Sequence, residues 1–141
     1  MMKVDDLTIE RDKKVTSEET VEEFLVTFPE CKHIYTEHLK DYGELLQHVF
    51  YAEVINLPLA ELLKTNKDTA QIQKYISFVE RMWSQGDETV QNVVDVTILE
   101  YLSDDEEVWI HFGTYISDNF RNYINRELLK QNCAMWHVKQ V

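Results

Sequence analysis

Apolar side chains recur at every third or fourth position through most of the chain, a spacing that places them on one face of an α-helix. The first such stripe covers residues 21–28. Thr16 and Glu19 precede it at the spacing of a capping box, and Pro29 follows it. This pattern predicts a first helix that starts near Thr16 and ends before Pro29.

Similar stripes continue along the chain, separated by short polar breaks. Gly43 and Gly86 supply helix stop signals, and Pro58 marks either a kink or the first turn of a short helix. We expect further helices over about residues 30–42, 44–54, 59–64, 72–83, 87–102, 104–112 and 115–130.

Residues 90–102 are rich in β-branched side chains, so a buried strand is the competing interpretation of this segment. Its length, a possible cap at Asp87 and the 3.6-residue period favour a helix. The predicted fold is therefore all-α, with seven or eight antiparallel helices in one compact bundle or a short HEAT-like stack of helical hairpins. Residues 1–15 are expected to form a loosely ordered N-terminal arm and residues 16–141 a single helical domain.

The composition agrees with one globular domain, because 141 residues are 44% hydrophobic and 28% charged. The scarcity of Gly (3) and Pro (2) argues against turn-rich β-sandwiches and Gly-rich phosphate loops. Cys31 and Cys133 are too few for a disulfide framework. The polar start resembles no secretory signal, and no apolar run approaches the roughly 20 residues of a membrane span. We therefore expect a cytoplasmic protein.

Acidic residues outnumber basic ones by 26 to 14, which gives a formal charge of −12. Such a surface repels polyanions, so we expect no nucleic-acid partner and no docking on anionic membranes. It favours fast association with a protein that has a basic surface.

The excess charge is concentrated in one stretch. Residues 80–107 hold nine acids and one base, a net charge of −8, whereas residues 111–141 hold two acids and four bases. The acidic run 104–107 also suits a helix N-terminus, which is its structural explanation. The candidate partner-binding residues are the steering carboxylates Glu88, Asp95, Asp104, Asp105, Glu106 and Glu107, with Tyr101 and Trp109 as aromatic anchors.

Candidate catalytic or metal sites are incomplete. Glu30 and His33 form one Glu-x-x-His pair, but di-iron bundles need two such pairs and the chain has no second. Glu44 and His48 have i, i+4 spacing and could act as a carboxylate-oriented base or hold a metal, yet no nucleophile is placed beside them. We expect no catalytic residues and no cofactor, with a metal-binding or enzymatic bundle that uses Glu44 and His48 as the alternative.

Two stretches carry a resemblance to a known kind of protein: His38–Phe50, and Glu88–Val94 followed by Ile98–Leu102. Together they resemble an uncharacterised bacterial family of small acidic all-helical proteins, over about residues 20–125. Members of that kind look like immunity proteins of toxin systems. The resemblance implies no catalytic residues.

These observations predict a cytosolic protein-binding module, an immunity-type inhibitor that occludes a cognate bacterial toxin stoichiometrically with an acidic face. Besides the metal-binding or enzymatic bundle, a helical adaptor that binds a peptide in an interhelical groove stays open as an alternative.

Overall fold

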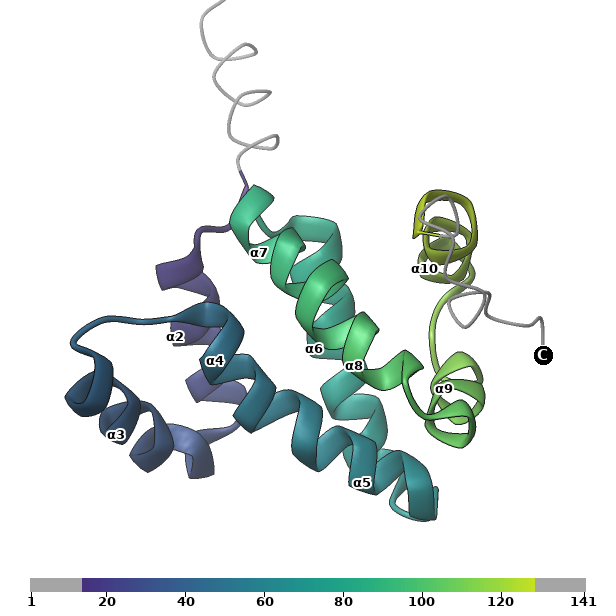
Figure 1. Cartoon of the computed structure of the whole chain (residues 1–141), viewed down its shortest axis with the longest axis horizontal. Coiled ribbons are helices and arrows are strands. Elements are labelled where there is room, and N and C mark those ends of the chain that lie inside the picture. Colours follow the sequence, from purple (N-terminus) through teal and green to yellow (C-terminus); the bar gives the residue numbers. More distant parts are fainter. Residues whose placement is uncertain (1–13, 129–141) are drawn as a thin grey trace, which may run out of the picture.

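The computed structural model describes residues 14–128, which form seven continuous helical segments and no strand (Figure 1). This confirms the predicted all-α bundle. Residues 1–13 of the expected arm and the end of the last expected helix lie outside the described residues.

The first two helices end where the sequence predicts. Helix α2 (Ser17–Thr27) begins with a capping box, in which the Thr16 side chain accepts the Glu19 N–H at 3.2 Å and the Glu19 carboxylate accepts the Thr16 N–H at 3.0 Å. A 3₁₀ turn, η1 (Pro29–Cys31), leads directly into α3 (Lys32–Tyr42). Helix α3 ends at Gly43, whose φ of 78° is left-handed and therefore suits glycine.

Three long helical segments form the middle of the bundle (Figure 1). The first consists of α4 (Gln47–Tyr51), the π turn η2 (Ala52–Asn56) and α5 (Leu57–Thr65). The second is the single helix α6 (Thr69–Gln85). The third consists of α7 (Glu88–Asn92), the π turn η3 (Val93–Ile98) and α8 (Leu99–Ser103). Helix α6 returns antiparallel to the other two segments, which run side by side in the same direction. The buried Asn56 amide links these parallel segments, because it donates to the Thr97 carbonyl at 3.1 Å.

The first long segment differs from prediction at its start. It begins at Gln47 and not at Glu44, because the chain bends after the left-handed Gly43 and becomes extended at Leu46. Pro58 lies in the first turn of α5, which is one of the two predicted alternatives, and the π turn η2 just before it keeps the segment helical. A proline has no backbone N–H, so the carbonyl four residues before it lacks the hydrogen-bond donor that it has in a regular α-helix. That carbonyl lies in the wider π turn η2.

The β-branched segment is helical, as favoured by its period. Val93, Val94 and Ile98 are fully buried on the inner side of the α7–η3–α8 segment. Burial against the neighbouring helices outweighs the β-propensity of these residues.

The C-terminal part packs along one side of this core, beside α6 and α8 (Figure 1). It consists of α9 (Glu106–Gly113), α10 (Asp118–Tyr123) and the π turn η4 (Ile124–Leu128). The last helix starts at Asp118 rather than at the expected Tyr115, since the Ser117 hydroxyl caps it by accepting the Phe120 N–H. Arg121 is buried and donates to the Gly113 carbonyl at 2.6 Å, which ties α10 to the end of α9.

The core contains two groups of packed aromatic rings. Phe24 lies within 6.0 Å, between ring centroids, of each of four rings from α2 to α6: Phe28, Phe50, Tyr51 and Phe78. Phe120 packs on Trp83 at 4.8 Å and joins α10 to α6. None of the described helices has both the length and the apolar character required to cross a bilayer.

Candidate functional site

Several acids of residues 80–107 hold the fold together. The Glu80 carboxylate accepts the N–H and the hydroxyl of Ser117, each at 2.7 Å, and so holds the start of α10. Asp87 and Asp105 are the N-caps of α7 and α9 and accept the N–H of the residue three positions on. These carboxylates are already used in hydrogen bonds, so the structural explanation of the acidic run holds for Asp105.

Asp95 is also tied into the fold. Its two carboxylate oxygens accept the Tyr123 hydroxyl, at 2.9 and 2.8 Å, across the interface between η3 and α10. Burial raises the pKa of this carboxyl, and the hydrogen bond from Tyr123 only partly offsets that effect. A half-buried carboxylate with a bonded partner is poorly placed for long-range steering, in contrast to its predicted role.

Trp109 is a core residue, which corrects its predicted place as a surface anchor. Only 4% of its surface is exposed, and its ring stacks on Phe112 with 5.2 Å between centroids. The run of acids before it is the first turn of α9, and a tryptophan at this register points inward with Val108. Tyr101, the other predicted anchor, is 40% exposed.

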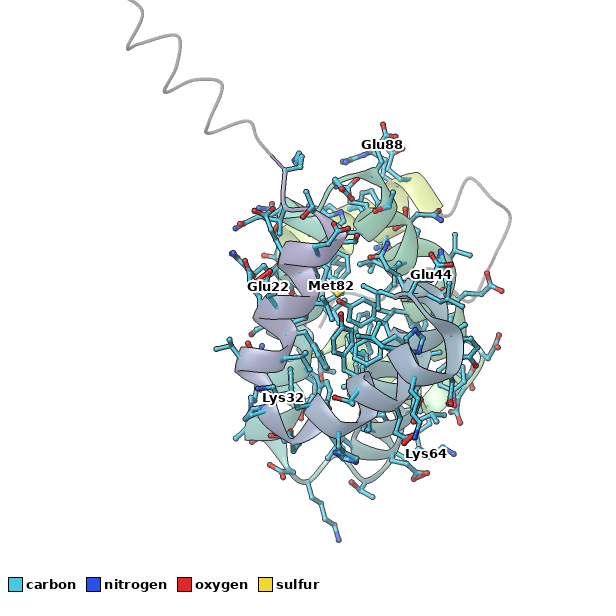
Figure 2. The ribbon with its side chains drawn as sticks, turned by 90° about the vertical axis from the view of Figure 1, so that its left-hand side faces the viewer. Glu22, Lys32, Glu44, Lys64, Met82 and Glu88 are labelled. Carbon is cyan, nitrogen blue, oxygen red and sulfur yellow. The ribbon has the colours of Figure 1, made fainter. Side chains whose placement is uncertain are left out.

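Glu88 is separated from the other steering residues. It opens α7, whereas Asp104 to Glu107 follow the far end of α8, about 24 Å away at ~1.5 Å of rise per residue. In Figure 2, Glu88 lies at the opposite end of the molecule from Lys64, the side chain that reaches Asp105. The predicted acidic stretch therefore does not converge into one patch.

The carboxylates that do gather lie around the turn between α8 and α9. Four of them, Glu100, Asp104, Glu106 and Glu107, are exposed. Helix α5 packs beside this turn through Lys64, whose ammonium lies 3.9 Å from the Asp105 carboxylate, and it adds the exposed Glu61 one turn earlier. We define the acidic edge as these five carboxylates: Glu61, Glu100, Asp104, Glu106 and Glu107.

Lys64 is the base that the structure places at this turn, and it pairs with Asp105 rather than with a carboxylate of the acidic edge. None of the five carboxylates of the edge forms an ion pair or a side-chain hydrogen bond within residues 14–128. The exposed apolar side chains of Tyr101 and Ile110 belong to the same two helices, and Ile110 is 53% exposed. Sequence reasoning missed Glu61 because it lies some forty residues before the acidic run, and only the packing of α5 on α9 joins them.

A second surface feature is a hollow of about 310 Å³ between α3 and the α4–η2 segment. Its walls are His33, Ile34, Glu37, His38, Asp41, Tyr42, Val49 and Glu53. The α3 residues form two neighbouring rows at i, i+4 and i+8, which is a signal the sequence does contain. His38 is 4% exposed and its Nε2 accepts the Leu46 N–H at 2.9 Å, so this ring is fixed in place.

The two histidine pairs singled out in the sequence are not assembled into a centre. Glu44 lies in the turn before α4, so it does not share a helical face with His48 as its spacing predicts. The His48 Nδ1 contacts the Thr97 hydroxyl at 2.5 Å instead. In the part of the chain that the structure describes, no three or more His, Cys, Asp or Glu side chains are grouped so that they could hold a metal ion.

The His48–Thr97 contact links helices rather than forming a catalytic triad. A hydroxyl nucleophile needs a base that is oriented by a third group. Between residues 14 and 128, no carboxylate hydrogen-bonds the His48 ring.

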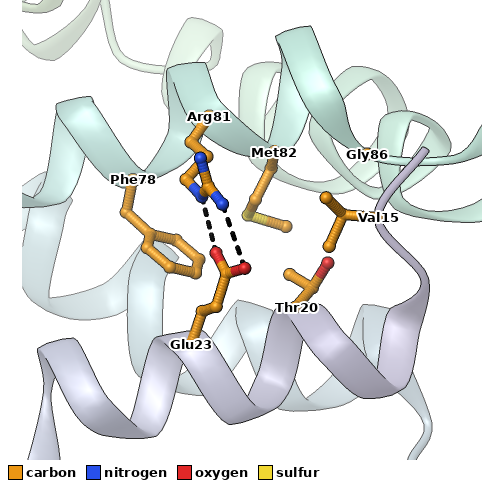
Figure 3. Close-up of a pocket in the computed structure, with 7 residues that line it drawn as sticks. All are labelled: Val15, Thr20, Glu23, Phe78, Arg81, Met82 and Gly86. Atoms are coloured by element: carbon orange, nitrogen blue, oxygen red, sulfur yellow. Dashed lines mark hydrogen bonds and ion pairs between the residues drawn. The ribbon is translucent and has the colours of Figure 1, made fainter. Parts of the chain in front are cut away.

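A third surface feature lies between α2 and α6, where Figure 3 shows Glu23 and Arg81 in the lining of a small pocket. There the Arg81 guanidinium donates twice to the Glu23 carboxylate, at 2.5 and 3.0 Å, and lowers the pKa of Glu23. Next to this pocket is a shallow groove of about 330 Å³ that includes Val26, 82% exposed. Because Arg81 neutralises Glu23 and only Glu22 is left as a further charge in its lining, this groove attracts a charged partner less than the acidic edge does.

The fold and these surfaces define a small, acidic, all-helical protein with one group of exposed carboxylates on an edge and another around a hollow. Residues 21–132 match the DUF7674 model, a domain of unknown function, so the chain belongs to this family. The expected membership of an uncharacterised family is thereby confirmed, and the resemblance to immunity proteins stays a prediction. No curated protein matches the chain, and no solved structure matches it either.

Proposed function

We propose that this protein is a protein-binding module of the immunity type, which uses the acidic edge to occlude a basic surface of a cognate bacterial toxin in the cytoplasm. The observation that supports the proposal is the group of five exposed, unpaired carboxylates from three elements, Glu61, Glu100, Asp104, Glu106 and Glu107. Like charges gathered on one edge repel one another, so they oppose folding unless a partner compensates them.

Binding would proceed in two stages. The acidic edge raises the association rate by attracting a basic surface over a distance of about one Debye length, ~8 Å at physiological salt. Tyr101 then supplies an aromatic contact with a polar tip, of the kind that lowers dissociation rates in protein interfaces. The mechanism is stoichiometric and requires no catalytic group on this chain.

The first test is the neighbouring gene. A gene for a large toxin with a variable C-terminal domain next to this one supports the proposal. An operon of metabolic enzymes contradicts it.

The second test measures binding of that toxin domain by surface plasmon resonance at several salt concentrations. The test variant neutralises four edge positions: Glu100→Gln, Asp104→Asn, Glu106→Gln and Glu107→Gln. We expect its association rate to fall by about tenfold at low salt and its salt dependence to flatten, because steering scales with the unpaired charge.

A matched control removes the same charge from exposed positions elsewhere: Glu22→Gln, Glu30→Gln, Glu44→Gln and Glu88→Gln. Its association rate should stay within about twofold of the native value, since none of these residues lies on the acidic edge. Equal losses in both variants would mean that net charge, and not this edge, governs association. A toxin domain that is neither bound nor inhibited by the native chain would contradict the proposal as a whole.

A further inference from the structure

The hollow between α3 and the α4–η2 segment has walls of mixed chemistry. Three exposed carboxylates line it, Glu37 and Asp41 from α3 and Glu53 from the opposite wall. Among residues 14–128, none of the three forms an ion pair or a side-chain hydrogen bond. No lysine or arginine is among the lining residues, so negative charge inside the hollow is uncompensated.

Apolar and aromatic surface adjoins these carboxylates. Tyr42 is 51% exposed and Val49 43% exposed, so both side chains can contact a molecule that enters the hollow. The Tyr42 ring lies 4.8 Å from the His38 ring, between centroids, and His38 is held by the Leu46 N–H. The wall is therefore anchored in the core and presents an aromatic side chain beside the carboxylates.

The hollow is large enough for one long side chain of a partner. Its volume of about 310 Å³ is at the lower end of the roughly 300–1,000 Å³ range of ligand pockets. A long side chain that ends in a cation would bring its stem against Val49 and Tyr42 and its charge to the carboxylates.

We propose that this hollow binds an arginine side chain of a protein partner. A guanidinium is planar and offers five N–H donors, so it can serve carboxylates on opposite walls while it stacks on an aromatic ring. An ammonium is a compact point charge without this plane, and a neutral side chain leaves the three carboxylates without a counter-charge. The inference does not depend on the acidic edge or on the partner being a toxin.

The experiment follows backbone amide NMR signals of the ¹⁵N-labelled full chain at pH 7.5 and low salt. The probe is the blocked tripeptide acetyl-Gly-Arg-Gly-amide, compared with the same peptides that contain lysine or citrulline. We expect saturable shifts centred on Tyr42 and Val49, with millimolar affinity for the arginine peptide. Binding should be at least threefold weaker for lysine and absent for citrulline, because citrulline keeps the shape of arginine without its charge.

Two variants locate the site. Asp41→Asn combined with Glu53→Gln should weaken the arginine peptide at least fivefold, and Tyr42→Ala about threefold, because these changes remove the counter-charges and the aromatic face. All three positions are exposed on at least part of their side chains, and an otherwise unchanged NMR spectrum confirms that the variants fold. As a matched control, Glu106→Gln combined with Glu107→Gln removes two charges from the acidic edge and should leave the affinity unchanged.

Four results would overturn the inference. One is a set of shifts spread equally over all exposed acids, which would mean unspecific attraction. Another is equal binding of the citrulline or lysine peptide. A third is an unchanged affinity in the Asp41/Glu53 variant. The fourth is the absence of saturable shifts when the arginine peptide is added to the native chain.

Discussion

At the scale of single residues, the same side-chain type serves opposite purposes according to its surroundings. Asp95 and Asp104 are nine positions apart in the acidic stretch, yet Asp95 is half-buried against Tyr123 and Asp104 is exposed without a partner. Trp109 and Tyr101 differ in the same way, because one is in the core and the other on the surface. Residue type alone therefore does not separate a docking residue from a structural one.

The raised pKa of Asp95 predicts how this residue affects stability. A carboxyl whose pKa is higher in the folded state than in the unfolded chain stabilises the fold while it is protonated. That contribution is complete below its unfolded pKa and is lost as the pH rises through its folded pKa. We expect Asp95→Asn, which keeps an acceptor for the Tyr123 hydroxyl without the charge, to be more stable than the native chain at pH 7.

Urea unfolding of both proteins between pH 3 and pH 8 measures this effect. The two unfolding free energies should converge at the acid end and separate as the pH rises. A variant that is less stable at pH 7 would show that the hydrogen bond from Tyr123 to the charged carboxylate outweighs the cost of burying it.

At the scale of elements, the joint between α6 and α7 depends on close approach of the backbone. Gly86 ends α6 and forms the bridge to Val15, whose carbonyl accepts the Asp87 N–H at 2.8 Å. The φ of Gly86 is an ordinary −70°, so its importance is spatial and not conformational. A Cβ at this position would lie 2.4 Å from the Val90 side chain and 2.5 Å from the Met82 carbonyl oxygen.

We expect Gly86→Ala to destabilise the fold by about 1–3 kcal/mol, the usual cost of overpacking a tight site. The added Val90→Ala change removes the side-chain clash but leaves a cavity at a fully buried position, and the Met82 carbonyl stays in place, so it should restore at most part of the loss. Thermal and chemical unfolding of the native chain and the two variants measures the difference. Stability equal to the native chain in Gly86→Ala would mean that the α6–α7 joint relaxes freely.

At the scale of the whole molecule, the charged side chains are distributed unevenly, and some of them lie where they lower the stability of the fold. Glu100 and Asp104 lie at the C-terminal end of the continuous α7–η3–α8 segment, where the helix dipole disfavours negative charge. Glu106 and Glu107 lie in the first turn of α9, where the dipole favours it. Four of the five carboxylates of the acidic edge are therefore divided between two favourable and two unfavourable placements.

This arrangement predicts opposite responses of two double variants. Glu100→Gln with Asp104→Asn should raise stability by a few tenths to about 1 kcal/mol at low salt. Glu106→Gln with Glu107→Gln should lower it or leave it unchanged, although the same charge is removed. Both differences should shrink in 0.5 M salt because exposed charges are screened. Urea unfolding at two salt concentrations measures them, and equal responses of the two variants would contradict the argument.

The sequence by itself determined the helices and most of their ends. The apolar period, the capping box at Thr16 and Glu19, and the stop at Gly43 are local features, and local hydrogen bonds and backbone preferences decide them. The predicted start at Glu44 was wrong, because the chain after Gly43 does not return to a helix before Gln47. At Pro58 the sequence left a kink and a first helical turn open, and the structure places the proline in the first turn of α5.

Only the tertiary structure decided which charges belong together. Glu61 belongs to the acidic edge because α5 packs on α9. Glu88 lies far from this edge because it begins the α7–η3–α8 segment, whereas the edge lies where that segment ends. Glu53 faces Glu37 and Asp41 for a similar reason, because α3 folds back beside α4. Within a helix, residues three and four positions apart are neighbours, so their contacts can be predicted from the sequence. Contacts between helices depend on how the buried faces pack, and short sequence patterns do not determine that packing.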